Sequence, residues 1–153
     1  DRRHYERDSE ETVVIKLSPF VKAVERALSE RCKYTTYLGE VTIDNPPMPY
    51  ALVGFPKANY GDATTLDNAV SEISFLQPVT TVASTADRLL VVLDDVRAAL
   101  EGYELQVGRQ HCEPLVLEYC SAMLRDNQVT LPEKKHPMYA VDMWRIRAVN
   151  RFH

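Results

Sequence analysis

His111 and Cys112 stand side by side, and imidazole and thiolate are both ligands of zinc. A structural zinc site takes four such ligands, and the sequence has no Cys-x-x-Cys or His-x-x-x-His pair to complete this one. We therefore interpret His111 as a loop residue beside a small buried thiol. The sequence predicts no metal and no cofactor.

Cys120 is the second candidate for chemistry, because a cysteine paired with a histidine can act as a nucleophile. It lies within the apolar run EPLVLEYCSAML, which reads as a strand, and this setting suits an inert core thiol better than a reactive one. The three cysteines, Cys32, Cys112 and Cys120, cannot all pair within one chain and are expected to be reduced.

Carboxylates and phosphate-binding loops offer no stronger case for catalysis. Asp94 and Asp95 are adjacent on a predicted helix, so they point about 100° apart and cannot share a proton as a dyad. The chain has 5 glycines and no Gly-rich phosphate loop or nucleophile elbow. We expect a protein that is not an enzyme, with a small thiol hydrolase as the alternative from another class.

Composition points to one soluble globular domain. The 153 residues are 45% hydrophobic and 26% charged, and no apolar run approaches the ~20 residues of a membrane span. Residues 1–11, DRRHYERDSEE, are expected to form a flexible charged arm before a single domain over residues 12–153. The net charge is −4, and because residues 131–153 hold five Lys or Arg against two acids, residues 1–130 carry −7.

The expected elements give an α+β fold with two helices on one face of a sheet of about five strands, mostly antiparallel with room for a parallel pair. Helices are predicted from Ser18 to Cys32 and from Ser84 to Leu100, with Ser18 and Ser84 as N-caps and Gly102 after the second helix. Strands are predicted at 35–43, 50–55, 69–83, 103–107, 113–124 and 138–149. Pro78 predicts a bulge or an edge position for the third of the long strands.

The last strand, MYAVDMWRIRAV, is apolar on both faces. Ala140, Trp144, Ile146 and Ala148 alternate with Tyr139, Val141, Met143 and Val149. Two helices can cover one face of such a sheet, so we expect another copy of the chain to cover part of the second. Val141, Met143 and Arg145 are the predicted contacts between subunits.

The polar loop KANYGDATTLDN, residues 57–68, is the other candidate contact. Long loops between good strands are often kept for binding, and tyrosine is a favoured interface anchor. We expect Lys57, Tyr60 and Asp62 to touch a neighbouring subunit or another partner protein, with a plain solvent loop as an equally good interpretation.

The order of the elements resembles one family. A Pro-containing helix leads to YLGEV and PPMPYALVGFP, then to an aromatic strand with Phe75 and Gln77, a Ser/Thr-capped helix ending DDVRAAL, and the closing run to YAVDMWRIRAV. Over residues 18–149 this series is similar to the tail terminator proteins of long-tailed bacteriophages, especially those of actinobacterial hosts.

The resemblance implies a structural virion protein of the tail and neck region, assembled in the host cytoplasm. Such a protein forms a homo-oligomeric ring, expected to be hexameric, that ends polymerisation of the tail tube. Its implied partners are the major tail tube protein and a head-completion or neck protein; viral DNA passes through without specific binding, and no membrane is involved. We expect an acidic ring interior, because like charge discourages DNA from binding. Another neck or tail-completion component, and an adaptor that binds a peptide along a sheet edge, are the alternatives.

Overall fold

The computed structural model describes residues 16–56 and 72–150, which form two helices and seven strands. In chain order these are α2 (Ser18–Arg31), β1 (Thr35–Leu38), β2 (Tyr50–Val53), β3 (Glu72–Ala83), α3 (Ala86–Leu100), β4 (Gln110–Cys112), β5 (Val116–Cys120), β6 (Leu124–Arg125) and β7 (Met138–Asn150). The α+β expectation is confirmed. The predicted strand at 103–107 is wrong, since strand structure begins at Gln110 there, and the predicted strand at 113–124 is divided between β5 and β6.

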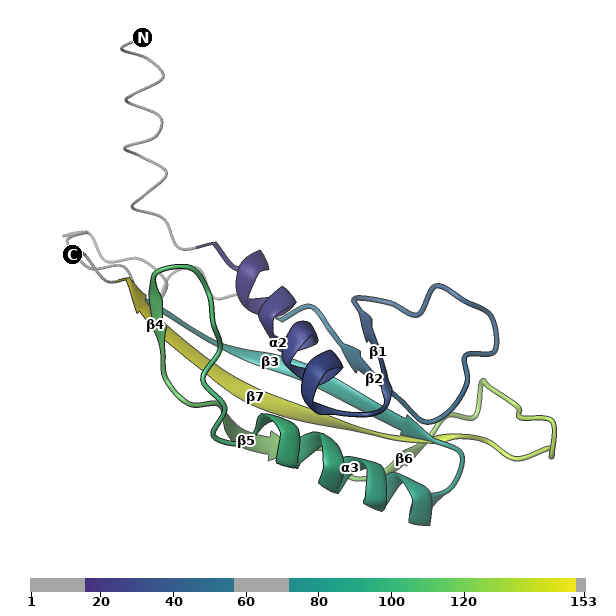
Figure 1. The fold of residues 1–153 in the computed structure, drawn as a ribbon. Helices are drawn as coiled ribbons and strands as arrows, with labels where there is room; N and C mark the ends of the chain where they lie inside the picture. The colour runs from purple at the N-terminus through teal and green to yellow at the C-terminus, as the bar shows by residue number, and fades with distance from the viewer. Residues whose placement is uncertain (1–15, 57–71, 151–153) are drawn as a thin grey trace, which may run out of the picture.

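One mixed sheet contains all the strands, in the order β1-β2-β3-β7-β4, with β5 and β6 also paired to β7. Its spine is the antiparallel pair of β3 and β7, in register from Glu72 opposite Val149 to Ala83 opposite Met138. The β1–β2 pair is parallel, and every other pair is antiparallel. Both helices lie on the same side of this long twisted sheet (Figure 1).

Pro78 lies inside the central strand β3 without a bulge, so the expectation of an edge or a bulge is wrong. A strand residue points its N–H and C=O to the same side, and the Pro78 carbonyl accepts from Gly54 N at 3.0 Å. Proline has no N–H, so the carbonyl of Gly54, just past the end of β2, receives no backbone hydrogen bond from position 78. The Gln77 side-chain Nε2 donates to that carbonyl at 2.6 Å and replaces the N–H that proline lacks.

The core lies between the helices and one face of the sheet. Along β3 and β7 every second side chain is buried there, and Trp144 at the centre is fully buried. The ring of Phe20 on α2 meets Phe75 on β3 edge to face, with centroids 6.3 Å apart. This burial follows the period of two that the sequence shows in its last strand.

The helix ends differ slightly from the sequence expectation. Thr85, not Ser84, caps α3, and its hydroxyl accepts a bond from Arg88 N at 3.1 Å. Leu17, not Ser18, occupies the N-cap position of α2 and makes no side-chain cap bond. Gly102 follows α3 with a φ of +75°, the left-handed conformation in which glycine commonly ends a helix.

Candidate interaction surface

The sheet face opposite the helices is the candidate functional surface, and we call it the open face. Residues that pair across a ladder share a face, so its members follow from the strand registers. They are Thr35, Tyr37, Tyr50, Leu52, Glu72, Ser74, Leu76, Pro78, Thr80, Val82, His111, Val116, Tyr119, Leu124, Tyr139, Val141, Met143, Arg145, Arg147 and Val149. The predicted contact residues Val141, Met143 and Arg145 all lie on it.

One end of the open face carries ion pairs between residues of neighbouring strands. Arg145 on β7 pairs with Glu118 on β5, and this carboxylate raises the pKa of the guanidinium. Arg147 pairs with Glu72 on β3 at 2.9 Å and lies 3.6 Å from Glu113. These groups are exposed, so the pairs add little stability but keep this end of the face polar.

The other end of the open face is apolar. Met143 pairs with Pro78 and Val141 with Thr80 across the spine, and the Tyr37 and Tyr50 rings meet edge to face, 5.4 Å apart. Burial is the main cause that raises the pKa of Tyr50. A groove of about 620 Å³ continues this surface between β2, β3 and the segment before β7. Its apolar lining includes Pro46, Met48, Tyr50, Val129, Pro137 and Tyr139, and its polar lining includes Arg125, Asp126, Asn127 and Gln128. An apolar sheet face of this breadth is typical of a surface that another protein covers.

The edge formed by β5 is exposed and apolar as well. Val116 is 45% exposed and Tyr119 58%, and Met123 and Leu124 continue the row. β5 pairs with β7 on one side, and no backbone bond on its outer side occurs within the described residues. An exposed edge strand with apolar side chains is a template for a further strand.

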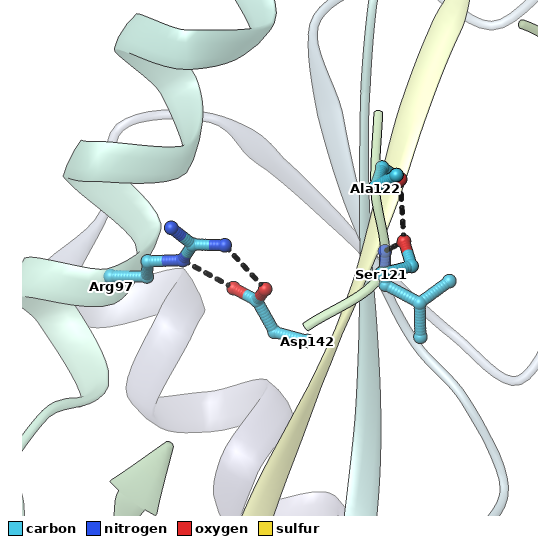
Figure 2. A network of polar contacts seen from close by, with 5 residues as sticks. Arg97, Ser121, Ala122 and Asp142 are labelled. Atoms are coloured by element: carbon cyan, nitrogen blue, oxygen red, sulfur yellow. Dashed lines mark hydrogen bonds and ion pairs between the residues drawn. The ribbon is translucent and has the colours of Figure 1, made fainter. Parts of the chain in front are cut away.

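Beneath this edge, a fully buried carboxylate fixes α3 to β7. Asp142 is 0% exposed, and Arg97 donates to it twice, from Nε at 2.8 Å and from a terminal nitrogen at 2.7 Å (Figure 2). Asp142 raises the pKa of Arg97, and the neighbouring Cys120 adds to this effect. Close by, Ser121 extends the pairing with β7, because its N–H donates to Val141 O at 2.8 Å and its hydroxyl accepts from Val141 N at 2.9 Å.

The thiols of the described residues lie in different settings. Cys120 is exposed, contrary to the predicted core position, because β5 is an edge strand. Cys112 is buried on β4, and burial raises the pKa of its thiol. In the same part of the chain, no group of three or more His, Cys, Asp or Glu residues is placed to hold a metal ion.

Some predicted features cannot be placed on this surface. Lys57, Tyr60 and Asp62 lie outside the described residues, as does the charged arm over residues 1–11. Among the described helices, none has the length and apolar character needed to cross a membrane.

Comparison with known proteins gives a likeness of fold. No protein-family model and no curated protein matches the sequence. A solved structure described as the virion of a native gene transfer agent particle contains a chain that superposes with a TM-score of 0.61 at 12% identity, over 85% of this chain and 94% of that one. A second solved chain gives a TM-score of 0.47 at 14% identity, over 89% and 93% of the two chains. The described chain thus has the fold of a component of that gene transfer agent virion.

Proposed function

We propose that this protein is a structural virion component, a tail terminator that forms a ring at the head-proximal end of a phage tail tube. The observation that carries the proposal is the fold shared with a chain of a gene transfer agent virion, over most of both chains. The order of sequence elements that resembles tail terminators is an independent support. The proposed role is assembly and joining, without catalysis.

Two unlike apolar patches support association into a ring. Val116 and Tyr119 lie on the β5 edge, whereas Phe55, 74% exposed, lies over Gly39 beside the β1 edge. A contact between two different patches is heterologous, and repeated heterologous contacts close into a ring when the rotation permits. A single self-complementary patch would instead favour a two-fold dimer.

The apolar end of the open face then meets either the neighbouring subunit or the last ring of the major tail tube protein. The head-completion or neck protein binds the other side of the ring, and viral DNA passes through the middle. The exposed residues of α3 include Asp87 and Asp94 but also Arg88, Leu90 and Val91, so this helix by itself does not supply the acidic wall expected of such a passage.

The test combines size in solution with tail morphology. Wild-type protein should elute as an oligomer whose size depends on concentration or on added tail tubes. Phage carrying Val141→Asp should make overlong or headless tails, because the new charge lies on the half-buried apolar end of the open face. Gln106→Asp, on an exposed loop away from that face, is the matched control and should give normal tails.

A compact monomer at every concentration, also in the presence of tail tubes, would contradict the proposal. Normal tail length with the protein found elsewhere in the neck would instead identify another tail-completion component.

A further inference from the structure

Phe55, just past the end of β2, is the side chain from which we draw a further inference. It is 74% exposed, more than any other large apolar side chain of the described residues. The ring is nevertheless supported from behind, because it lies against Gly39 so closely that an added Cβ there would come within 2.7 Å of it. Gly39 is itself fixed, since its N–H donates to Val53 O at 2.8 Å. A large apolar ring that is both exposed and supported is suited to enter a hole in another protein.

The groove between β2, β3 and the segment before β7 is a hole of suitable size and chemistry. Its volume is about 620 Å³, whereas a cavity of about 150 Å³ is enough for a benzene ring. Met48, Tyr50 and Val129 contribute to its apolar lining. The groove also continues the exposed row on β5 and β6, because Leu124 lies opposite Tyr139, another lining residue, in the β6–β7 pair.

A chain cannot fill its own groove with Phe55, because the two features lie at opposite ends of β2. Tyr50, in the groove, is the first residue of the strand, and Phe55 lies two residues beyond the last. Five residues of strand span about 17 Å. We propose that the Phe55 ring of one copy inserts into the groove of the next copy. This inference rests on the proposed ring and names its contact: each copy presents one ring and one groove, which makes the contact heterologous.

Charge complementarity supports a second copy of this chain as the partner. Glu40 lies one residue after the glycine that supports Phe55, and Arg125 lines the groove. Both are exposed, and neither forms an ion pair within the part of the chain that the structure describes. Asp126, the other charged residue of the groove lining, is half-buried and already accepts a hydrogen bond from Gln128 N at 3.1 Å. Insertion of Phe55 therefore lets Glu40 approach an unpaired Arg125.

Photo-crosslinking of the full chain tests where the Phe55 ring lies. With p-benzoylphenylalanine in place of Phe55, ultraviolet light should give covalent dimers and longer species. Peptide mapping should place the link at lining residues of the groove such as Met48 or Val129. The same amino acid in place of Leu90, which is 52% exposed on α3, is the matched control and should give no covalent dimer.

Analytical ultracentrifugation tests how much the contact contributes to assembly. Phe55→Ala should raise the concentration needed for self-association at least about tenfold, because a buried aromatic anchor carries much of the energy of a contact. Leu90→Ala, the control, should leave this concentration unchanged. Glu40→Arg or Arg125→Glu alone should raise it about threefold, and the two together should restore the wild-type value. Circular dichroism should be unchanged throughout, because all four side chains are exposed.

The possible outcomes separate the contact from the ring. If wild-type protein assembles and Phe55→Ala assembles equally well, the contact is wrong and the ring stands. A link from position 55 to β5 overturns the assignment to the groove, and a link within one chain overturns the assignment to the next copy. Charge reversals that do not compensate each other overturn the approach of Glu40 to Arg125. If wild-type protein never assembles, even with tail tubes added, the proposed function fails and this inference with it.

Discussion

Removing either partner of the Arg97–Asp142 pair should have unequal costs, because the two groups differ in access to water. Asp142 has a side-chain exposure of 0% and Arg97 of 30%. Arg97→Met leaves a carboxylate with no water and no partner, and breaking a buried pair in this way costs about 3–5 kcal/mol. Asp142→Asn leaves a guanidinium that still reaches solvent and keeps one acceptor, so we expect the free energy of unfolding to fall by about 2 kcal/mol.

Replacing both partners together should be much less harmful than the sum of the single changes. Arg97→Met with Asp142→Leu removes both charges and fills the space with apolar groups, and we expect stability within about 1 kcal/mol of wild type. Arg147→Met is the control, because it makes the same Arg-to-Met substitution in an exposed ion pair on β7, the strand that carries Asp142. This variant should lower the free energy of unfolding by about 0–1 kcal/mol.

Urea unfolding followed by circular dichroism measures all four variants. With a slope of about 2 kcal/mol per molar urea, Arg97→Met should lower the midpoint by roughly 2 M and Asp142→Asn by about half as much. Equal losses in the two single variants, or losses no larger than in Arg147→Met, would refute the reasoning that water access decides the cost.

Three further predictions follow from contacts in the fold. Val141→Asp should raise the concentration needed for self-association by at least about tenfold with an unchanged far-ultraviolet spectrum, measured by analytical ultracentrifugation; an unaffected oligomer would exclude this part of the open face from the contact. The Tyr34 hydroxyl donates to Asp95 at 2.5 Å, and this hydrogen bond and burial raise the pKa of the tyrosine. The stability that the hydrogen bond contributes is therefore complete below about pH 10 and is lost as pH rises through the folded-state pKa. Tyr34→Phe should remove this alkaline loss of stability from urea titrations at about pH 8–11. The effect of Pro78→Val on the free energy of unfolding should be more favourable by about 1 kcal/mol in a Gln77→Met background than in wild type. The reason is that the valine N–H then donates to the Gly54 carbonyl in place of the Gln77 side chain. A double-mutant cycle without coupling would show that the two residues act independently.

The sequence predicted the parts of the fold that depend on local pattern. The two-residue period of the last strand separates Trp144 and Ile146, which are buried, from Val141 and Met143 on the open face. The spacing of apolar residues likewise placed α2 and α3 to within a few residues. Such patterns suffice because burial of one face is what fixes them.

The parts that depend on distant partners could not be predicted. The bidentate contact between Arg97 and Asp142 joins residues 45 positions apart, although an aspartate on the buried face of an apolar strand was a usable signal. The sequence predicted an edge position for Pro78, because local pattern does not show that the Gln77 side chain supplies the hydrogen-bond donor that proline lacks. Cys120 read as core because a strand pattern alone does not tell an edge from a centre.

The position of β7 bears on how the protein folds as it is made. It is the last described strand, yet it pairs with β3, β4, β5 and β6, and 54 residues separate the end of β3 from its start. While the ribosome is still synthesising the region before Met138, β1, β2 and β3 can pair, but the long edge of β3 has nothing to bind. Closing a contact of this sequence separation is slow, and an unpaired apolar edge is prone to aggregate in the interval. Folding of the nascent chain should therefore depend on chaperones until β7 emerges and completes the sheet in one step.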